Sequence, residues 1–316
     1  MNTEKQKYDA TILITTLNRK DDLERAIASI CTQEGNFEIM IIDDGSTDGT
    51  SDMVKEKFPD VRLITNPGPS GCPGARNQGA NLAKADYMIV MDDDAYTTDP
   101  YMFSKALKEF SSPQVGAVAM PYYENGEIIQ GKKDSENDYV ADWFIGAAHI
   151  VRLDIFLKLG GFRENFIMYG EEPDYCIRML QAGYVVKLAE TTPLVHEPNP
   201  VRDPLKNTTR RWVNEFAVKW YHAPLRYLPL AIGAHIVLIL LEIPEVGAKI
   251  SFQTIFRGIK RIFHVWGDRN PIDLEIYKLW RELRKGHLSY DYVIAQLDES
   301  RLQDPSKLRP SGNAPR

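Results

Sequence analysis

Short apolar runs alternate with helical patterns over the first 110 residues, and this alternation constrains the fold more than any other feature. Four runs are typical of buried strands, and three segments with helical spacing separate them. The expected strands cover residues 10–15, 38–43, 61–65 and 87–91, and the expected helices cover 21–32, 51–58 and 74–83. Such an alternation implies a parallel sheet with right-handed crossovers. The sequence therefore predicts an α/β fold, with a mostly parallel sheet flanked by helices.

The bulk properties are those of a globular protein without a basic surface. The chain has 316 residues and a net charge of −6, so we expect no nucleic-acid partner. Cys31, Cys72 and Cys176 are widely spaced and fit neither a zinc site nor a disulfide framework, which favours reduced thiols. The polar first residues are unlike a signal peptide. We therefore expect a cytoplasmic protein.

Three consecutive carboxylates, Asp92, Asp93 and Asp94, directly follow the strand expected at 87–91. Open α/β sheets bind their ligands at the carboxyl ends of the strands. Three adjacent negative charges are costly unless a cation lies among them, and Mg²⁺ and Mn²⁺ prefer such oxygen ligands. The run therefore predicts a divalent-metal site, with a solvated acidic turn as the alternative.

Another acid, Asp44, directly follows the strand expected at 38–43 and precedes Gly45, which permits a tight turn. Its side chain is expected to point into the same crevice and to accept hydrogen bonds from a base or ribose. An ordinary Asx turn that caps the next helix is the alternative.

Residues 68–79 form a glycine-rich loop that opens a helix, where backbone N–H groups can approach a ligand. Arg76 lies near the start of that helix, where a cation gains nothing from the helix dipole. A guanidinium aimed at phosphate or at the neighbouring carboxylates would explain it, and a solvated surface arginine is the alternative.

Two further acids, Glu171 and Glu172, directly precede Pro173. Because proline is favoured at the first helical position, Glu172 is expected at about the N-cap of a helix over 173–182. It either complements the helix dipole or deprotonates a hydroxyl nucleophile in a cleft. His196 is either structural or completes a metal shell begun by Asp94.

The rhythm changes near residue 110, so we divide the chain into residues 1–110, 111–200 and 201–316. Residues 120–140 are polar and irregular and suit a mobile loop or hairpin over a site. The region beyond about Asp304 is expected to be disordered.

The C-terminal third contains an apolar stretch at 227–241, which is shorter than a spanning helix requires. Basic and aromatic residues lie on both sides of it, among them Lys249, Arg257 and Lys260. Two interpretations stay open. The stretch either lies in the surface of an anionic membrane or packs on the catalytic domain or a subunit partner.

Together these segments resemble the family 2 glycosyltransferases, which are inverting enzymes with the glycosyltransferase-A fold. The resemblance runs from Thr11 to about Pro198, and its motifs follow in the family order. They lie at residues 12–19, 41–50, 74–79, 91–95, 160–164 and 169–178. Residues 143–148 resemble the segment that lines the acceptor pocket.

The resemblance implies a role for each matching position. Thr15, Leu17 and Asp44 would hold the nucleotide base, although the family often has an aromatic residue at the position of Leu17. The acidic run divides between donor contacts and metal binding. Asp92, Asp93 and Arg76 would contact the donor, Asp94 and His196 would ligate Mn²⁺ or Mg²⁺, and Glu172 would be the catalytic base, where many members have Asp.

The sequence therefore predicts an inverting, metal-dependent glycosyltransferase. It would move a sugar from a UDP-, dTDP- or GDP-linked donor to a hydroxyl of a glycan or lipid-linked acceptor, in the cytoplasm or at the inner face of the membrane. Two rival functions are a non-catalytic nucleotide-sugar-binding module of the same fold and a sugar-phosphate nucleotidyltransferase. The latter would release pyrophosphate, but the chain lacks the glycine-rich, basic loop expected after its first strand.

Overall fold

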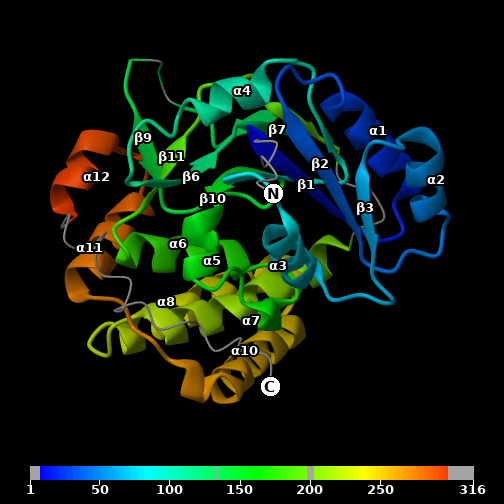
Figure 1. Cartoon of the computed structure of the whole chain (residues 1–316). Helices are drawn as coiled ribbons and strands as arrows, with labels where there is room; N and C mark the ends of the chain where they lie inside the picture. The colour runs from blue at the N-terminus through cyan, green and yellow to red at the C-terminus, as the bar shows by residue number, and fades with distance from the viewer. Residues whose placement is uncertain (1–7, 133, 135, 198–202, 298–316) are drawn as a thin grey trace.

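The computed structural model describes residues 8–132, 134, 136–197 and 203–297. Nine strands form one central sheet (Figure 1). They are β1 (Ala10–Thr16), β2 (Phe37–Asp43), β3 (Arg62–Thr65), β4 (Tyr87–Asp92), β6 (Val115–Ala119), β9 (Tyr139–Ala141), β10 (Ala148–Arg152), β11 (Val185–Leu188) and β13 (Leu288–Ser289). Their order is β13-β9-β11-β6-β10-β4-β1-β2-β3, and only β9 and β10 among them run opposite to the rest. The sheet is therefore mostly parallel, as predicted.

Helices cover both faces of this sheet because successive strand residues point to opposite sides. Ile12 and Ile14 belong to one buried cluster, and Leu13 belongs to the other. The first cluster includes side chains of α1 (Lys20–Ile30), α2 (Thr50–Lys57) and α4 (Met102–Leu107). The second includes side chains of α3 (Cys72–Leu82), α5 (Leu153–Lys158) and α6 (Glu171–Gln181). The domain thus has three layers.

The seven elements predicted before residue 92 are all present, and each end lies within two residues of its expected position. In the order β4-β1-β2-β3, the chain proceeds from β1 to one side and returns to place β4 on the other. The carboxyl ends of β1 and β4 therefore lie at a topological switch point of the sheet, where ligands of open sheets bind.

A second, small sheet lies beside the acidic run and has the order β5-β12-β7-β8. Its strands are β5 (Ala95–Tyr96), β12 (Leu194–His196), β7 (Tyr122–Glu124) and β8 (Glu127–Ile129). The segment expected to be a loop or hairpin over 120–140 contains the β7–β8 hairpin. Pairing of His196 with Ala95 places β12 directly beside the acidic run.

The C-terminal region is mostly helical, and in the view of Figure 1 its first helices lie below the sheet and its last two lie at the left edge, near β9. Its helices are α7 (Pro204–His222), α8 (Leu228–Leu241), α9 (Ile243–Val246), α10 (Ala248–His264), α11 (Leu274–Leu283) and α12 (Tyr290–Gln296). The apolar stretch 227–241 forms α8. No helix within the described ranges is both long and apolar enough to cross a bilayer. The tail beyond Asp304, which was expected to be disordered, lies outside the described residues.

Candidate active site

Strand register brings the predicted polar residues to one edge of the sheet. Thr15 lies opposite Asp92 in the β1–β4 pair, and Thr16 lies opposite Asp43 in the β1–β2 pair. Because these parallel strands end at the same level, the residues that follow them lie along one edge of the sheet. Sequence reasoning predicted this shared edge correctly.

The acidic run supplies two members of a candidate metal centre. One ligand atom from each of Asp92, Asp94 and His196 lies within 4.8 Å of the others. Asp94 Oδ1 lies 3.1 Å from His196 Nε2. Two carboxylates and one imidazole fit a divalent cation such as Mn²⁺, and nearby negative charge favours it further. The structure thus adds Asp92 to the predicted pair of metal ligands.

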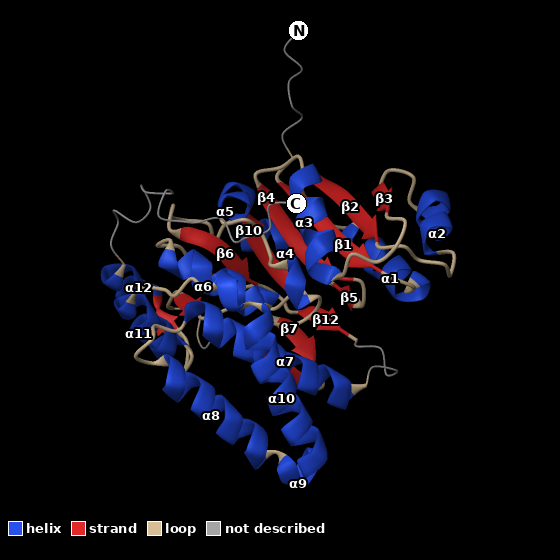
Figure 2. Ribbon diagram, turned by 90° about the horizontal axis from the view of Figure 1, so that it is seen from below, coloured by secondary structure: helices blue, strands red, loops and turns tan. Residues whose placement is uncertain are grey.

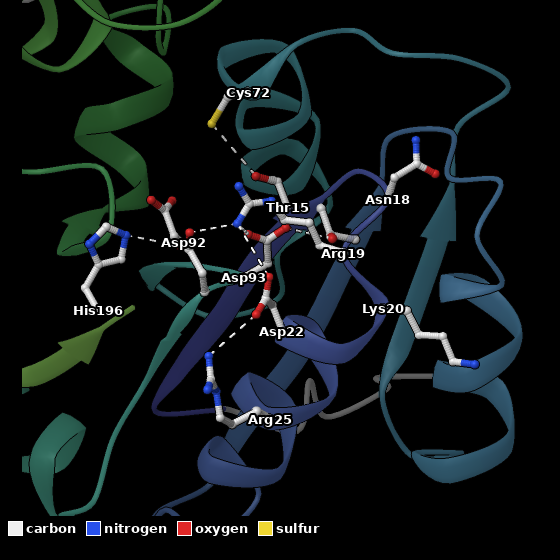
Figure 3. A network of polar contacts seen from close by, with 12 residues as sticks. Thr15, Asn18, Arg19, Lys20, Asp22, Arg25, Cys72, Asp92, Asp93 and His196 are labelled. Atoms are coloured by element: carbon white, nitrogen blue, oxygen red, sulfur yellow. Dashed lines mark hydrogen bonds and ion pairs between the residues drawn. The ribbon is translucent and has the colours of Figure 1, made fainter. Parts of the chain in front are cut away.

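Arg19 lies against the acidic run from the side of α1 (Figure 3). Its Nη1 donates to Asp94 Oδ2 at 2.7 Å and lies 3.3 Å from Asp93 Oδ1. The guanidinium therefore offsets part of the charge of the run. An incoming cation would share Asp94 with Arg19 or displace it.

Asp93 points away from the candidate metal centre. Its Oδ2 accepts a hydrogen bond of 2.8 Å from Thr16 Oγ1, and the side chain is buried. Burial raises the pKa of Asp93 to about 7, because Arg19 offsets only part of the effect of burial and of the charges on Asp94 and Asp92. Its predicted contact with the donor stays a prediction, and the visible role of Asp93 is to join β1 to the acidic run.

Glu124 holds His196 from the side opposite Asp94. His196 Nδ1 lies 2.9 Å from Glu124 Oε1, so the imidazole bridges two carboxylates. Burial lowers the pKa of His196, but the hydrogen bond to Asp94 and the surrounding negative charges outweigh it and raise the pKa above its ordinary value. Such an outer carboxylate orients a ligating imidazole in many metal sites.

Arg76 links the acidic run to the start of α6. Its Nη2 donates to Asp92 Oδ1 at 2.9 Å, and its Nη1 donates to Glu172 Oε1 at 3.4 Å. Only 2% of the residue is exposed. Of the alternatives for Arg76, a surface position is wrong and contact with the neighbouring carboxylates is confirmed. Contact with phosphate stays a prediction.

Gly146 lets these side chains approach. A Cβ atom there would lie 2.5 Å from Glu172 Oε1 and 2.8 Å from Arg76 Nη1, closer than real contacts allow. Residues 143–148 were predicted to line the acceptor pocket. The structure places this glycine directly over the Arg76–Glu172 pair.

Helix α6 begins two residues earlier than predicted. Gly170 is its N-cap, with a φ of 102°, so Glu172 lies in the first turn rather than at the N-cap. Pro173 is the third helical residue. Proline is tolerated at this position because N–H groups in the first turn of a helix have no intrahelical acceptor, so the missing N–H costs no hydrogen bond.

Both glutamates of this turn are buried at the helix N-terminus. Burial raises the pKa of Glu172, and Arg76 opposes the shift. Burial and the charge of Glu172 raise the pKa of Glu171 to about 8. A buried carboxylate with a raised pKa is a stronger base than a solvated one.

Asp44 lies at the predicted edge of the sheet and is held by the glycine-rich loop. Its oxygens accept hydrogen bonds from Ser70 N, Ser70 Oγ, Gly71 N and Asn66 Nδ2, at 2.8 to 2.9 Å. These four bonds fill the acceptor sites of a carboxylate. Its role as a contact of the base stays a prediction, and a base N–H would have to replace or share one of the loop donors.

The other two residues predicted to contact the nucleotide base, Thr15 and Leu17, lie at the end of β1 and just after it. Thr15 is half-buried, with its Oγ1 3.9 Å from Cys72 Sγ (Figure 3). Leu17 is 41% exposed. Both roles stay predictions.

Sequence reasoning gave no role to Arg19 or Glu124. Arg19 lies within the first matched motif, and a basic residue three positions after a strand end could have indicated its proximity to the acids. Glu124 is 72 residues from His196, so no local pattern connects them.

A family model described as "Glycosyl transferase family 2" matches residues 11–179, which is more than half of the chain. The match contains every residue of the predicted site except His196.

Three curated relatives are named for O-antigen biosynthesis, succinoglycan biosynthesis or glucosyl transfer. The O-antigen biosynthesis protein RfbC of Myxococcus xanthus is 21% identical over 94% of this chain, which spans only 26% of RfbC. The succinoglycan biosynthesis protein ExoA of Rhizobium meliloti is 24% identical over 72% of this chain and 78% of ExoA. The third is the UDP-Glc:alpha-D-GlcNAc-diphosphoundecaprenol beta-1,3-glucosyltransferase WfaP of Escherichia coli, which is 38% identical over 53% of this chain and 67% of WfaP.

A solved structure shares the fold. The mannosyltransferase PcManGT from Pyrobaculum calidifontis, in complex with GDP-Man and Mn²⁺, aligns with a TM-score of 0.56 and 19% identity. The alignment covers 96% of this chain and 85% of PcManGT. The fold is thus the glycosyltransferase-A fold, as predicted. From the family match and the arrangement of its motifs, this chain belongs to glycosyltransferase family 2.

Proposed function

We propose that this protein is an inverting, divalent-metal-dependent glycosyltransferase that transfers a sugar from a nucleoside diphosphate to a hydroxyl group. One observation carries the proposal. Arg76 bridges Asp92 of the candidate metal centre to the buried carboxylate of Glu172. A donor-activating centre and a base therefore face the same space.

In this proposal Asp92, Asp94 and His196 would hold Mn²⁺ or Mg²⁺. An ion held there would supply positive charge to offset the charge that develops on the diphosphate leaving group. Glu172 takes the proton of the acceptor hydroxyl, whose oxygen forms a bond to the anomeric carbon while the bond to the diphosphate breaks. One in-line displacement inverts the anomeric centre. Arg76 opposes the effect of burial on the pKa of Glu172 and so favours the ionised form of this carboxylate.

The acceptor is proposed from the relatives. WfaP is named for a diphosphoundecaprenol-linked acceptor, and RfbC and ExoA are named for polysaccharide biosynthesis. We infer a glycan or lipid-linked acceptor in cell-envelope polysaccharide or glycolipid synthesis, reached in the cytoplasm at the inner face of the membrane. The donor is a UDP-, dTDP- or GDP-sugar.

The test is a transfer assay with a panel of these donors, a polyprenyl-diphosphate-linked sugar acceptor and Mn²⁺. Wild type should release nucleoside diphosphate, and Glu172→Gln should bind donor with unchanged affinity but lose turnover by roughly 10²–10⁴-fold. Glu172→Asp, the residue of many relatives, should retain part of the activity. Turnover of Glu172→Gln within a few-fold of wild type would exclude Glu172 as the base, and release of pyrophosphate would indicate nucleotidyl transfer.

A further inference from the structure

Helices α8, α9 and α10 form a V-shaped arm that projects from the rest of the molecule, with α9 at its tip (Figure 2). One face of α10 packs on α7 through Ser251, Thr254, Gly258 and Ile262, which are buried. The packing is close, since a Cβ atom at Gly258 would lie 2.2 Å from the Phe216 ring.

A second face of α10, continued by Trp266 just beyond the helix, carries a stripe of large apolar side chains that stay largely exposed, although Trp266 also stacks on Trp220 of α7. The stripe consists of Phe252, Phe256, Ile259, Phe263 and Trp266, which are between 40% and 71% exposed. Spacings of four and three residues place the helical members on one side of the helix. We call this set the aromatic stripe.

Helix α8 adds apolar surface to the same arm. Leu230, Val237, Leu238 and Leu241 are 54% to 68% exposed, whereas His235 and Ile239 are buried. His235 Nε2 lies 2.8 Å from the carbonyl oxygen of Trp212 on α7. One side of α8 thus packs on protein, as one interpretation of 227–241 expects, while the other side is exposed, and its contact with a membrane stays a prediction. Exposed apolar areas of this extent mark interaction surfaces.

The charge of α10 identifies the kind of partner. The helix contains Lys249, Arg257, Lys260 and Arg261 and no acidic residue, although the whole chain carries a net charge of −6. At 100° per residue, Lys249, Lys260 and Arg257 follow one border of the aromatic stripe, and all three are exposed. Lysine and arginine beside an apolar stripe can extend toward phosphate groups while the stripe lies among acyl chains.

We propose that the α8–α10 arm seats this protein on an anionic lipid surface. The aromatic stripe enters the interfacial region, and the basic border of α10 lies over the lipid phosphates. The proposal assigns residues to membrane contact and does not require turnover. It is thus tested separately from the proposed function.

The arm is also connected to the candidate active site. Arg261 Nη2 donates to the Asn165 carbonyl oxygen at 2.6 Å, and Asn214 Nδ2 of α7 donates to the carbonyl oxygens of Met168 and Tyr169 at 3.0 and 2.7 Å. These carbonyls belong to the loop that leads into Glu171 and Glu172. Seating the arm therefore fixes the orientation of that loop relative to the membrane.

The experiment is flotation of the full chain with vesicles of phosphatidylcholine alone and with vesicles that also contain phosphatidylglycerol. Wild type should float with the anionic vesicles and be released by high salt. The double variant Phe252→Ser/Phe256→Ser should bind at least about tenfold more weakly. Its matched control is Tyr101→Ser/Ile128→Ser, which removes two comparably exposed apolar side chains elsewhere and should bind like wild type.

A second double variant and its control test how much the positive charge of α10 contributes to vesicle binding. Arg257→Gln/Lys260→Gln should weaken binding by roughly tenfold or more, since each cation near the surface is worth about 1 kcal/mol. Lys55→Gln/Lys84→Gln is the control with the same change in net charge. Because all these side chains are exposed, we expect melting temperatures close to that of wild type.

Two results would overturn the proposal. One is that wild type fails to float with anionic vesicles, or that both double variants of the arm float as well as wild type does. The other is a dimer in solution that Phe252→Ser/Phe256→Ser dissociates without any vesicle binding by wild type, which would make the aromatic stripe an interface between copies of the chain.

Discussion

At the scale of single residues, the site is defined by a few cations among many buried carboxylates. Arg76 contacts Asp92 and Glu172, and Arg19 contacts Asp93 and Asp94. Each guanidinium thus contacts two carboxylates of the candidate site. A lysine at either position would provide the charge without the fork that reaches two partners.

Glu171 provides a test of this buried charge. Its pKa is raised from an ordinary value near 4.5 to about 8 by burial and by Glu172. Between these pH values the folded state holds a proton that the unfolded state has released, so its contribution to stability is present at low pH and lost as pH rises. Glu171→Gln removes this dependence, which amounts to at most about 1.4 kcal/mol per pH unit.

The measurement is the free energy of unfolding of wild type and Glu171→Gln between pH 5 and 8. We expect the stability of the variant relative to wild type to increase with pH. Glu275→Gln, on an exposed side chain, should show a constant difference. A constant difference for Glu171→Gln as well would contradict a raised pKa at this residue.

At the scale of elements, replacing two helical glycines by alanine is expected to change the stability of the protein in opposite directions. A Cβ atom at Gly258 of α10 would meet the ring of Phe216 on α7, whereas one at Gly233 of α8 would meet no atom within 4 Å. Gly258→Ala should therefore cost about 1–3 kcal/mol through overpacking. Gly233→Ala should stabilise by about 0.5–1 kcal/mol, because alanine is the better helix former. Chemical denaturation measures both, and equal effects would refute the α7–α10 packing.

The elements also show what local sequence determines. Apolar runs such as 87–91 predicted the strands before residue 92, and parallel topology then brought Asp44 and Asp92 to one edge. The contact of His196 with Glu124 depends on pairing of β12 with β7, which no local pattern contains. The exposed stripe on α10 was missed because its spacing alone is equally typical of a buried helix face.

At the scale of the whole molecule, a buried charge cluster joins the candidate active-site helix to the C-terminal helices. Asp174 of α6 accepts hydrogen bonds from Arg163 and Arg178, each at 3.0 Å, and lies 2.8 Å from Nε2 of His222, the last residue of α7. Burial opposes ionisation, but the surrounding cations outweigh it and hold the pKa of Asp174 well below its usual range.

Asp174→Asn should destabilise the protein by about 3–5 kcal/mol, because it leaves buried arginines without their counter-ion. Thermal or chemical unfolding measures the loss. Asp52→Asn, on a side chain that is 87% exposed, is the control and should change stability by less than about 0.5 kcal/mol. A loss below about 1 kcal/mol at Asp174 would mean that the cluster does not join the two regions energetically.

The central claim is that the residues at the edge of the sheet form a metal-dependent donor site. The most direct measurement is a thermal-shift panel of UDP-, dTDP- and GDP-sugars, each with Mn²⁺, with Mg²⁺ and with chelator, for wild type and Asp94→Ala. We predict a metal-dependent rise in melting temperature for one nucleotide in wild type and no rise in Asp94→Ala. A rise that survives chelation, or that persists in Asp94→Ala, would contradict the assignment of Asp92, Asp94 and His196 as the metal centre.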